Sequence, residues 1–293
     1  SYPGAFTEFI LRLGGKPAIQ KYPGHDFFQR VLKMKPGQDN GKTRQLAAQI
    51  AILYLERKKN GMDHYSDINN NAIDNYYYSH LDFDPENPEC VRLRNILEFL
   101  ESRFGNWSGP KLVAHNAIHL VLLVDSLMTQ DYTLSWQESL HNAQRLFSHD
   151  LVQASKDSKA GTHNETWLQY GQWTRTNSDR GESIKRRHHY FTSRMVEYMG
   201  NLTPRDPKRA FNDIERQLVY WRDNGKCQKF GCGATVEWAK AEIHHVIEHQ
   251  FGGQTVVDNG ALMHKECHPK GEAALEFAER YKILFPERFS DSV

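Results

Sequence analysis

Residues 242–270 read EIHHVIEHQFGGQTVVDNGALMHKECHPK and hold five of the chain's 15 histidines, a density typical of metal binding or catalysis. Three short stretches have strand-like composition: TVEW at 235–238, EIHHVIE at 242–248 and GALM at 260–263. After them, apolar side chains recur at helical spacing, at Ala274, Phe277, Ala278 and Tyr281. We therefore predict a small unit in which two strands are followed by a helix.

Cysteine spacing predicts a structural zinc site around these strands. Cys227 and Cys232, separated by four residues, lie before the strand pair, and His264 and Cys267 lie after its second strand. Three thiols and one imidazole form a tetrahedral zinc ligand set, which can hold a small unit together without a large core. The alternative is a group of buried thiols and a surface histidine. Three of the four cysteines fall in this histidine-rich segment, so we expect metal binding in a reducing compartment rather than disulfides. The fourth, Cys90, stands alone.

The adjacent histidines His244 and His245 are expected to have different roles. Side chains alternate across a strand, so neighbours point to opposite faces unless the backbone is locally irregular. The pair Gly252–Gly253 follows, and after it come Asn259 and His268. Imidazole groups can bind a metal ion or accept a proton, so these histidines are candidate site residues. The nearby His249 is more typical of a surface or packing residue, and we do not include it in the predicted site.

In residue type and register, residues 227–271 resemble the zinc-containing branch of the HNH (ββα-metal) endonuclease family. The resemblance implies that His245 is the general base, since a neutral imidazole can accept a proton from water, and that Asn259 orients it. It also implies that His244 and His268 hold a catalytic divalent ion. Many relatives carry Asp at the first of these positions. With two nitrogen ligands, Ni²⁺ or Zn²⁺ would serve as well as the expected Mg²⁺ or Mn²⁺.

The function implied by this resemblance is a metal-dependent DNA endonuclease that hydrolyses phosphodiester bonds, by nicking or by double-strand cleavage. Two alternatives stay open: a zinc-stabilised nucleic-acid-binding module without cleavage activity, and a homing or housekeeping nuclease. Two positions depart from the family pattern. Glu248 stands where relatives often have proline, and Lys270 is displaced from the position of a frequent lysine. Neither position supplies the central chemistry.

Basic side chains in two places are candidate phosphate contacts. The formal net charge is only +1, so any nucleic-acid surface must be local. Arg186 and Arg187 lie beside aromatic residues in the stretch IKRRHHYFTSR, and Lys265 and Lys270 flank the predicted metal site. A solvated helix face is an equally good interpretation of the first stretch.

The first two thirds of the chain predict a helical domain. Helical periodicity or an absence of strand-like alternation marks the stretches 46–54, 93–104, 112–129, 134–156 and 165–200. Between Gly200 and Pro207 two prolines break this pattern. We therefore predict a mostly α-helical protein, with a helical domain for substrate recognition or regulation over residues 1–204 and an HNH domain over residues 205–293.

The N-terminal part carries a second resemblance. YPGAFTEFILRLGGKPAIQK at 2–21 and RQLAAQIAILYLE at 44–56 resemble the helical region of DUF262 (GmrS-like) proteins of prokaryotic restriction and anti-phage defence. The resemblance implies a defence role and a chain that is the C-terminal part of a longer protein, or one that works with a partner of a defence system. No glycine-rich phosphate loop is visible, so nucleotide binding is not expected.

Hydropathy argues against a membrane partner. The mean hydropathy is −0.70, and the apolar run Ile118–Val124 is far shorter than the roughly 20 residues of a membrane-spanning helix. The N-terminus lacks the charged start and apolar core of a signal peptide. We therefore expect a cytoplasmic protein.

Overall fold

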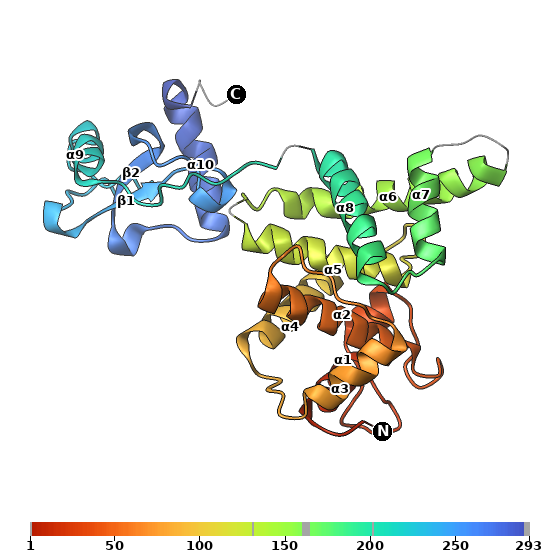
Figure 1. Ribbon diagram of the computed structural model, residues 1–293. Helices are drawn as coiled ribbons and strands as arrows, with labels where there is room; N and C mark the ends of the chain where they lie inside the picture. Colours follow the sequence, from red (N-terminus) through yellow and green to blue (C-terminus); the bar gives the residue numbers. More distant parts are fainter. Residues whose placement is uncertain (1, 131, 160–164, 201, 290–293) are drawn as a thin grey trace. The chain divides into compact units, whose positions relative to one another are not determined.

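The computed structural model describes residues 2–130, 132–159, 165–200 and 202–289 (Figure 1). The chain divides into two compact units. The first comprises residues 1–129 and 139–201, and the second comprises residues 130–138 and 202–293. The described residues contain many helices and one two-stranded antiparallel sheet, which confirms the mostly α-helical fold class.

The short segment 130–138 packs with the second unit although it precedes the rest of that unit by more than 60 residues. Thr133 N–H donates to the carbonyl of Thr203, and Leu134 N–H donates to the carbonyl of Gln250, both at 2.9 Å. The sequence-based division at residues 204 and 205 placed this segment with the first domain, because local patterns carry no information about such distant backbone pairing.

The first unit is built from helices whose apolar faces form a common core. Helix α5 is its most buried element, since every residue of the run Ile118–Val124 is at most 4% exposed. Asn69 and Asn87 cap the helices α3 and α4 by accepting backbone N–H bonds. The helices are α1 (Ala5–Gly14), α2 (Lys42–Asn60), α3 (Asn70–Ser79), α4 (Pro88–Phe104), α5 (Ala114–Thr129), α6 (Trp136–Lys159), α7 (Glu165–Arg175) and α8 (Gly181–Met199).

The apolar run in α5 is thus part of a protein core. Among the described residues, no helix combines the length and the apolar character needed to cross a membrane.

Helix α8 buries one of the basic residues that the sequence suggested for phosphate contact. Arg187 is only 1% exposed, and its guanidinium donates to the carbonyls of Trp173, at 2.6 Å, and Ser178. It occupies the inward face of α8 together with Ile184 and Phe191, so we do not retain it as a phosphate contact. A charge run in sequence does not show which of its members lies on the buried stripe of a helix.

Two buried histidines next to this arginine predict acid sensitivity of the first unit. Arg187 Nε–H donates to His119 Nε2 at 3.4 Å, which requires an unprotonated nitrogen there, and the His188 ring centroid lies 5.5 Å from that of His119. Burial is the main cause that holds the pKa of both imidazoles well below the usual value. The unfolded chain binds protons at these residues below about pH 6.5, whereas the folded chain does not.

The free energy of unfolding should therefore fall as the pH drops below about 6.5, by at most about 1.4 kcal/mol per pH unit for each histidine. We expect a lower thermal transition by far-UV circular dichroism at the acid pH. His188→Leu should flatten this pH dependence, whereas replacement of the exposed His149 by glutamine should leave it unchanged. Equal slopes for all three proteins would contradict the assignment.

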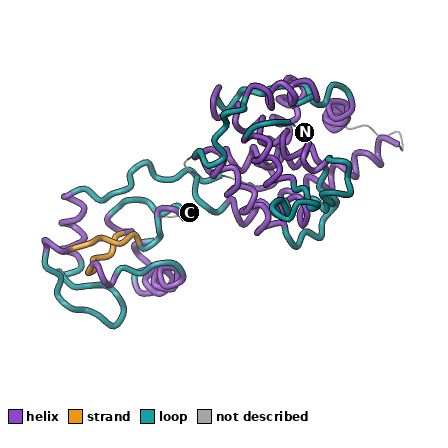
Figure 2. Tube along the Cα trace, turned by 90° about the horizontal axis from the view of Figure 1, so that it is seen from below, coloured by secondary structure: helices purple, strands orange, loops and turns teal. Residues whose placement is uncertain are grey.

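The second unit places a hairpin between two helices, as the orange strands in Figure 2 show. Helix α9 (Asp213–Arg222) begins with a capping box between Asn212 and Glu215. Strands β1 (Ala241–His245) and β2 (Gly260–His264) pair antiparallel from Ala241 opposite His264 to His245 opposite Gly260. Helix α10 (Glu272–Leu284) follows. Their buried side chains form one core, which includes Val219, Val246, Leu262, Met263, Phe277 and Tyr281.

The TVEW stretch, whose composition is strand-like, forms no strand among the described residues of this unit. Thr235 makes only an isolated bridge with Lys226, and a short 3-10 helix occupies Trp238–Lys240. Thr235 and Val236 lie in a loop, and the Val236 side chain packs into the core. β-Branched composition alone therefore did not identify a strand here.

Candidate metal centres and active site

The four predicted zinc ligands converge at one end of the hairpin. Cys227 and Cys232 lie in the turns after α9, His264 ends β2, and Cys267 lies in the 3-10 helix that follows. Their ligand atoms all lie within 4.8 Å of one another. Gln228 N–H donates to the carbonyl of Leu262 at 2.8 Å, which holds the first turn against β2.

The distances within this cluster fit a tetrahedral zinc ion. His264 Nδ1 lies 3.7 Å from Cys232 Sγ and 3.8 Å from Cys267 Sγ. Zn–S bonds of about 2.3 Å and Zn–N bonds of about 2.1 Å at tetrahedral angles would separate sulfur and nitrogen by about 3.6 Å. His264 Nε2 lies 3.1 Å from the carbonyl of Thr235. Donation there leaves the lone pair of Nδ1 directed at the thiols.

One thiol of the cluster is already acidic without a metal. The backbone N–H of Ala234 is the main cause that lowers the pKa of Cys232 to about 7, with the neighbouring thiols and His264 as smaller causes. Zinc binds thiolates, so a lowered pKa favours metal binding near neutral pH. The donor set and its geometry therefore suggest a structural zinc site.

A second pair of imidazoles lies on the other side of the same strands. His244 Nδ1, on β1, is 3.3 Å from Nε2 of His268, which directly follows the 3-10 helix Lys265–Cys267. Two nitrogens bound to one ion at about 2.1 Å are about 3.0–3.4 Å apart. His268 Nδ1 lies 3.2 Å from the carbonyl of Pro269, and donation there leaves the Nε2 lone pair facing His244. The pair can therefore hold one cation.

Burial keeps His244 in the neutral form that a metal ligand needs. Its side chain is 1% exposed and packs against the ring of Phe277, with ring centroids 5.4 Å apart. Burial, and next the neighbouring His268, lower the pKa of His244 to about 3. No described residue forms a hydrogen bond with the buried His244 Nε2, so Nδ1 is the nitrogen that is engaged.

The neighbouring His245 faces different residues but borders the same cavity. Its ring centroid lies 4.5 Å from that of Phe211, and its Nε2 lies 2.9 Å from Oγ1 of Thr255. Burial, followed by the charge of His249, lowers the pKa of His245 to about 4, so the ring is neutral near pH 7. A cavity of about 360 Å³ brings these groups together, and it is lined by Arg205, Arg209, His244, His245, Glu248, His249, Gln250 and His268.

Asn259 shapes the loop between the strands and does not line this cavity. Its side-chain oxygen accepts from Ile247 N–H at 2.8 Å, and its amide nitrogen donates to the carbonyls of Ile247, at 2.9 Å, and Gln254, at 2.8 Å. The double glycine fits this loop, because a Cβ on Gly253 would lie 1.7 Å from the carbonyl oxygen of Ile247, and Gly252 has a φ of +92°. The loop that carries His245 at its start is thus held in shape.

A segment from before α9 completes the cavity. The carbonyl of Asp206 lies 2.5 Å from His249 Nε2, and the Asp206 carboxylate accepts from Thr255 N–H at 2.7 Å. Thr255 Oγ1–H donates to the carbonyl of Lys208 at 2.5 Å. This segment places Arg205 and Arg209 in the wall of the cavity. Sequence reasoning missed both arginines, and no local signal marks them.

The remaining predicted phosphate contacts lie away from the cavity wall. Lys265 and Lys270 are exposed and do not line the cavity. Arg186 is exposed in the first unit, where its guanidinium pairs with Glu182 at 3.0 Å.

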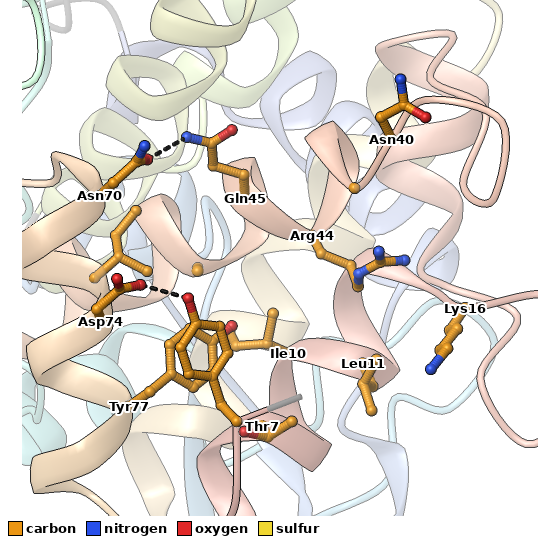
Figure 3. A pocket seen from close by; sticks show the side chains of 14 residues that line it. Thr7, Ile10, Leu11, Lys16, Asn40, Arg44, Gln45, Asn70, Asp74 and Tyr77 are labelled. Carbon is orange, nitrogen blue, oxygen red and sulfur yellow. Dashed lines mark hydrogen bonds between the residues drawn. The ribbon is translucent and has the colours of Figure 1, made fainter.

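The first unit has a cavity of its own, of about 680 Å³, between α1, α2 and α3 (Figure 3). The polar groups in its wall bond to one another: Gln45 donates to Asn70 at 3.1 Å, and Asp74 accepts from Tyr2, whose ring stacks on Tyr77. Its lining contains no histidine or cysteine, so it offers neither the ligands nor the base found in the second unit.

Two short strands and a helix around a Cys₃His cluster, with a pair of imidazoles beside it, define the second unit as a ββα-metal type. Residues 227–273 match the family model described as HNH endonuclease, so this part of the chain is an HNH endonuclease domain. Such a domain implies a nucleic-acid substrate and hydrolysis of phosphodiester bonds.

No curated protein and no solved structure matches the chain significantly. None of these comparisons supports the expected resemblance of the N-terminal part to DUF262 proteins.

Proposed function

We propose that the protein is a metal-dependent endonuclease that hydrolyses phosphodiester bonds of DNA. The observation that carries this proposal is the 3.3 Å approach of His244 Nδ1 and His268 Nε2, with His245 on the same cavity, inside the region that matches the HNH family. A binding module without cleavage has no need of this arrangement.

His244 and His268 would hold the catalytic divalent ion. When bound, the ion supplies positive charge to the phosphate and to the departing oxygen. Mg²⁺ or Mn²⁺ is the expected ion, and two imidazole ligands also suit Ni²⁺ or Zn²⁺. Asn259 keeps the loop after His245 in place through its three hydrogen bonds and need not touch the substrate.

His245 acts as the general base, and its hydrogen bonds determine which nitrogen does so. Thr255 Oγ1 has one proton and donates it to the carbonyl of Lys208, so it can only accept from His245. His245 Nε2 must then carry the ring proton, and Nδ1 is the nitrogen free to take a proton from water. Thr255 is 2% exposed, so no solvent competes for this bond.

Thr255→Val removes the acceptor and should lower cleavage about 10–100-fold, as loss of a hydrogen bond that orients an active-site histidine does. Thr255→Ser keeps the hydroxyl and should retain most of the activity. Nitrogen NMR of the His245 ring should show protonated Nε2 in the wild type and in Thr255→Ser, and a mixture of tautomers in Thr255→Val. A valine variant with the wild-type rate and the wild-type tautomer would contradict this role.

The proposed function is tested by incubating the purified chain with supercoiled plasmid and each divalent ion in turn. Nicked or linear DNA that requires the ion and is abolished in His244→Ala and His268→Ala supports it. DNA binding without cleavage under all ions would instead favour the zinc-stabilised binding module.

We also propose that this activity is cytoplasmic, because a Cys₃His ligand set fits a reducing compartment. A role in restriction or anti-phage defence is proposed on the N-terminal resemblance alone. It predicts that the chain, expressed with its genomic neighbours, lowers the plating efficiency of phage and that His245→Ala abolishes this effect.

A further inference from the structure

We infer that Arg205 and Arg209 form a phosphate-binding site in the wall of the histidine cavity, which takes the phosphodiester backbone of the nucleic acid. The inference rests on the proposed function and extends it to a segment that lies outside the family match at residues 227–273. Both arginines line the cavity beside His244, His245 and His268.

The unpaired Nε of Arg205 is the first reason for this assignment. Its Nε is buried and has no hydrogen-bond partner among the described residues, although a guanidinium is permanently charged. A buried donor left unpaired is unfavourable, and a guanidinium that turns toward a phosphate in the cavity would pair it. Arginine matches phosphate geometry, since its guanidinium can donate two parallel hydrogen bonds.

The second reason is that the backbone between the two arginines is held in place. Asp206 and Lys208 bond to His249 and Thr255 through three hydrogen bonds of 2.5, 2.7 and 2.5 Å. Both arginines therefore start from a fixed backbone next to the base, which lowers the cost of ordering them when a ligand binds.

The third reason is the charge of the cavity. Its wall contains two arginines and four histidines, and Glu248 is its one carboxylate. Gln250 Nε2 donates to that carboxylate at 2.8 Å. An ion held by two neutral imidazoles would keep its full positive charge, so the cavity favours an anion. A phosphodiester fits this preference and would lie between the arginines and the imidazole pair.

The experiment uses the full chain with His245→Ala, so that binding is measured without cleavage. Affinity for a short DNA duplex is followed by fluorescence anisotropy over a series of salt concentrations. Arg205→Gln should weaken binding about tenfold. It should reduce the slope of log K against log salt by about 0.9, and the double variant with Arg209→Gln by about 1.8. Lys240→Gln, which removes an exposed lysine paired with Glu237, should change neither value.

Arg205→Lys separates charge from geometry and guards against misfolding of the glutamine variant. It should restore the salt slope but not the full affinity, because lysine cannot donate in a bidentate manner. Zinc content and melting temperature are measured for every variant. An unchanged slope and affinity in the double variant, with normal zinc content, would overturn the phosphate site.

The phosphate site and the proposed function can fail separately. If the wild type cleaves plasmid but the arginine variants keep the full salt slope, only the phosphate site is lost. If the arginine variants flatten the slope but the wild type fails to cleave plasmid under every divalent ion tested, the nuclease proposal is lost and the binding site stands.

Discussion

Replacing His245 with alanine should lower the rate of DNA cleavage by roughly 10²–10⁴-fold, the usual contribution of a general base. The ring borders the same cavity as the imidazole pair, is neutral because burial lowers its pKa to about 4, and has its Nε2 2.9 Å from Thr255 Oγ1. The measurement is the initial rate at which supercoiled plasmid becomes nicked or linear at saturating Mn²⁺.

Two controls make the His245→Ala result specific. His149→Ala removes an exposed histidine of the first unit and should keep the wild-type rate. The His245→Ala protein should keep its zinc content and melting temperature, because the ring contributes little to the core of the second unit. Wild-type cleavage by a folded His245→Ala protein would rule out this residue as the base.

Removing zinc, or one of its ligands, should unfold the second unit. Cys227 is buried at 3% exposure and joins the turn after α9 to the end of β2, so Cys227→Ser disrupts both the ligand set and the core. Structural zinc contributes roughly 10–16 kcal/mol of apparent binding free energy in small zinc domains, which is comparable with the whole stability of an ordinary domain. Cleavage should fall to background.

Metal analysis and hydrogen exchange by mass spectrometry test this prediction together. The wild type should hold about one zinc per Cys₃His set, and Cys227→Ser should lose both the metal and the amide protection of residues 227–273. The helices of the first unit, which have their own core, should stay protected. Cys90→Ala, a change in helix α4 of the first unit, should keep zinc and cleavage. A serine variant with full zinc content and protection would contradict a structural role for the metal.

The zinc ligands and the hairpin could be predicted from the sequence because short-range spacing encodes them. The ligands come in two pairs that are close in sequence, Cys227 with Cys232 and His264 with Cys267. A hairpin of two short strands brings the two pairs together. The TVEW stretch has strand-like composition but forms no strand, because Thr235 and Val236 lie in a loop that makes only an isolated bridge with Lys226. The prediction of a phosphate contact at Arg187 was wrong for a related reason, because a run of basic residues does not show which side chain a helix buries.

The sequence by itself determined the mostly helical class, the HNH-like segment and the residue types needed for a metal and a base, because each depends on a periodicity or a spacing within a few turns. Only the tertiary structure decided that His244 and His268 approach within 3.3 Å, that His245 Nε2 lies 2.9 Å from Thr255 Oγ1, and that Arg205 lines the same cavity. These features join segments up to about 60 residues apart, and such contacts depend on how the backbone folds back on itself rather than on any local pattern.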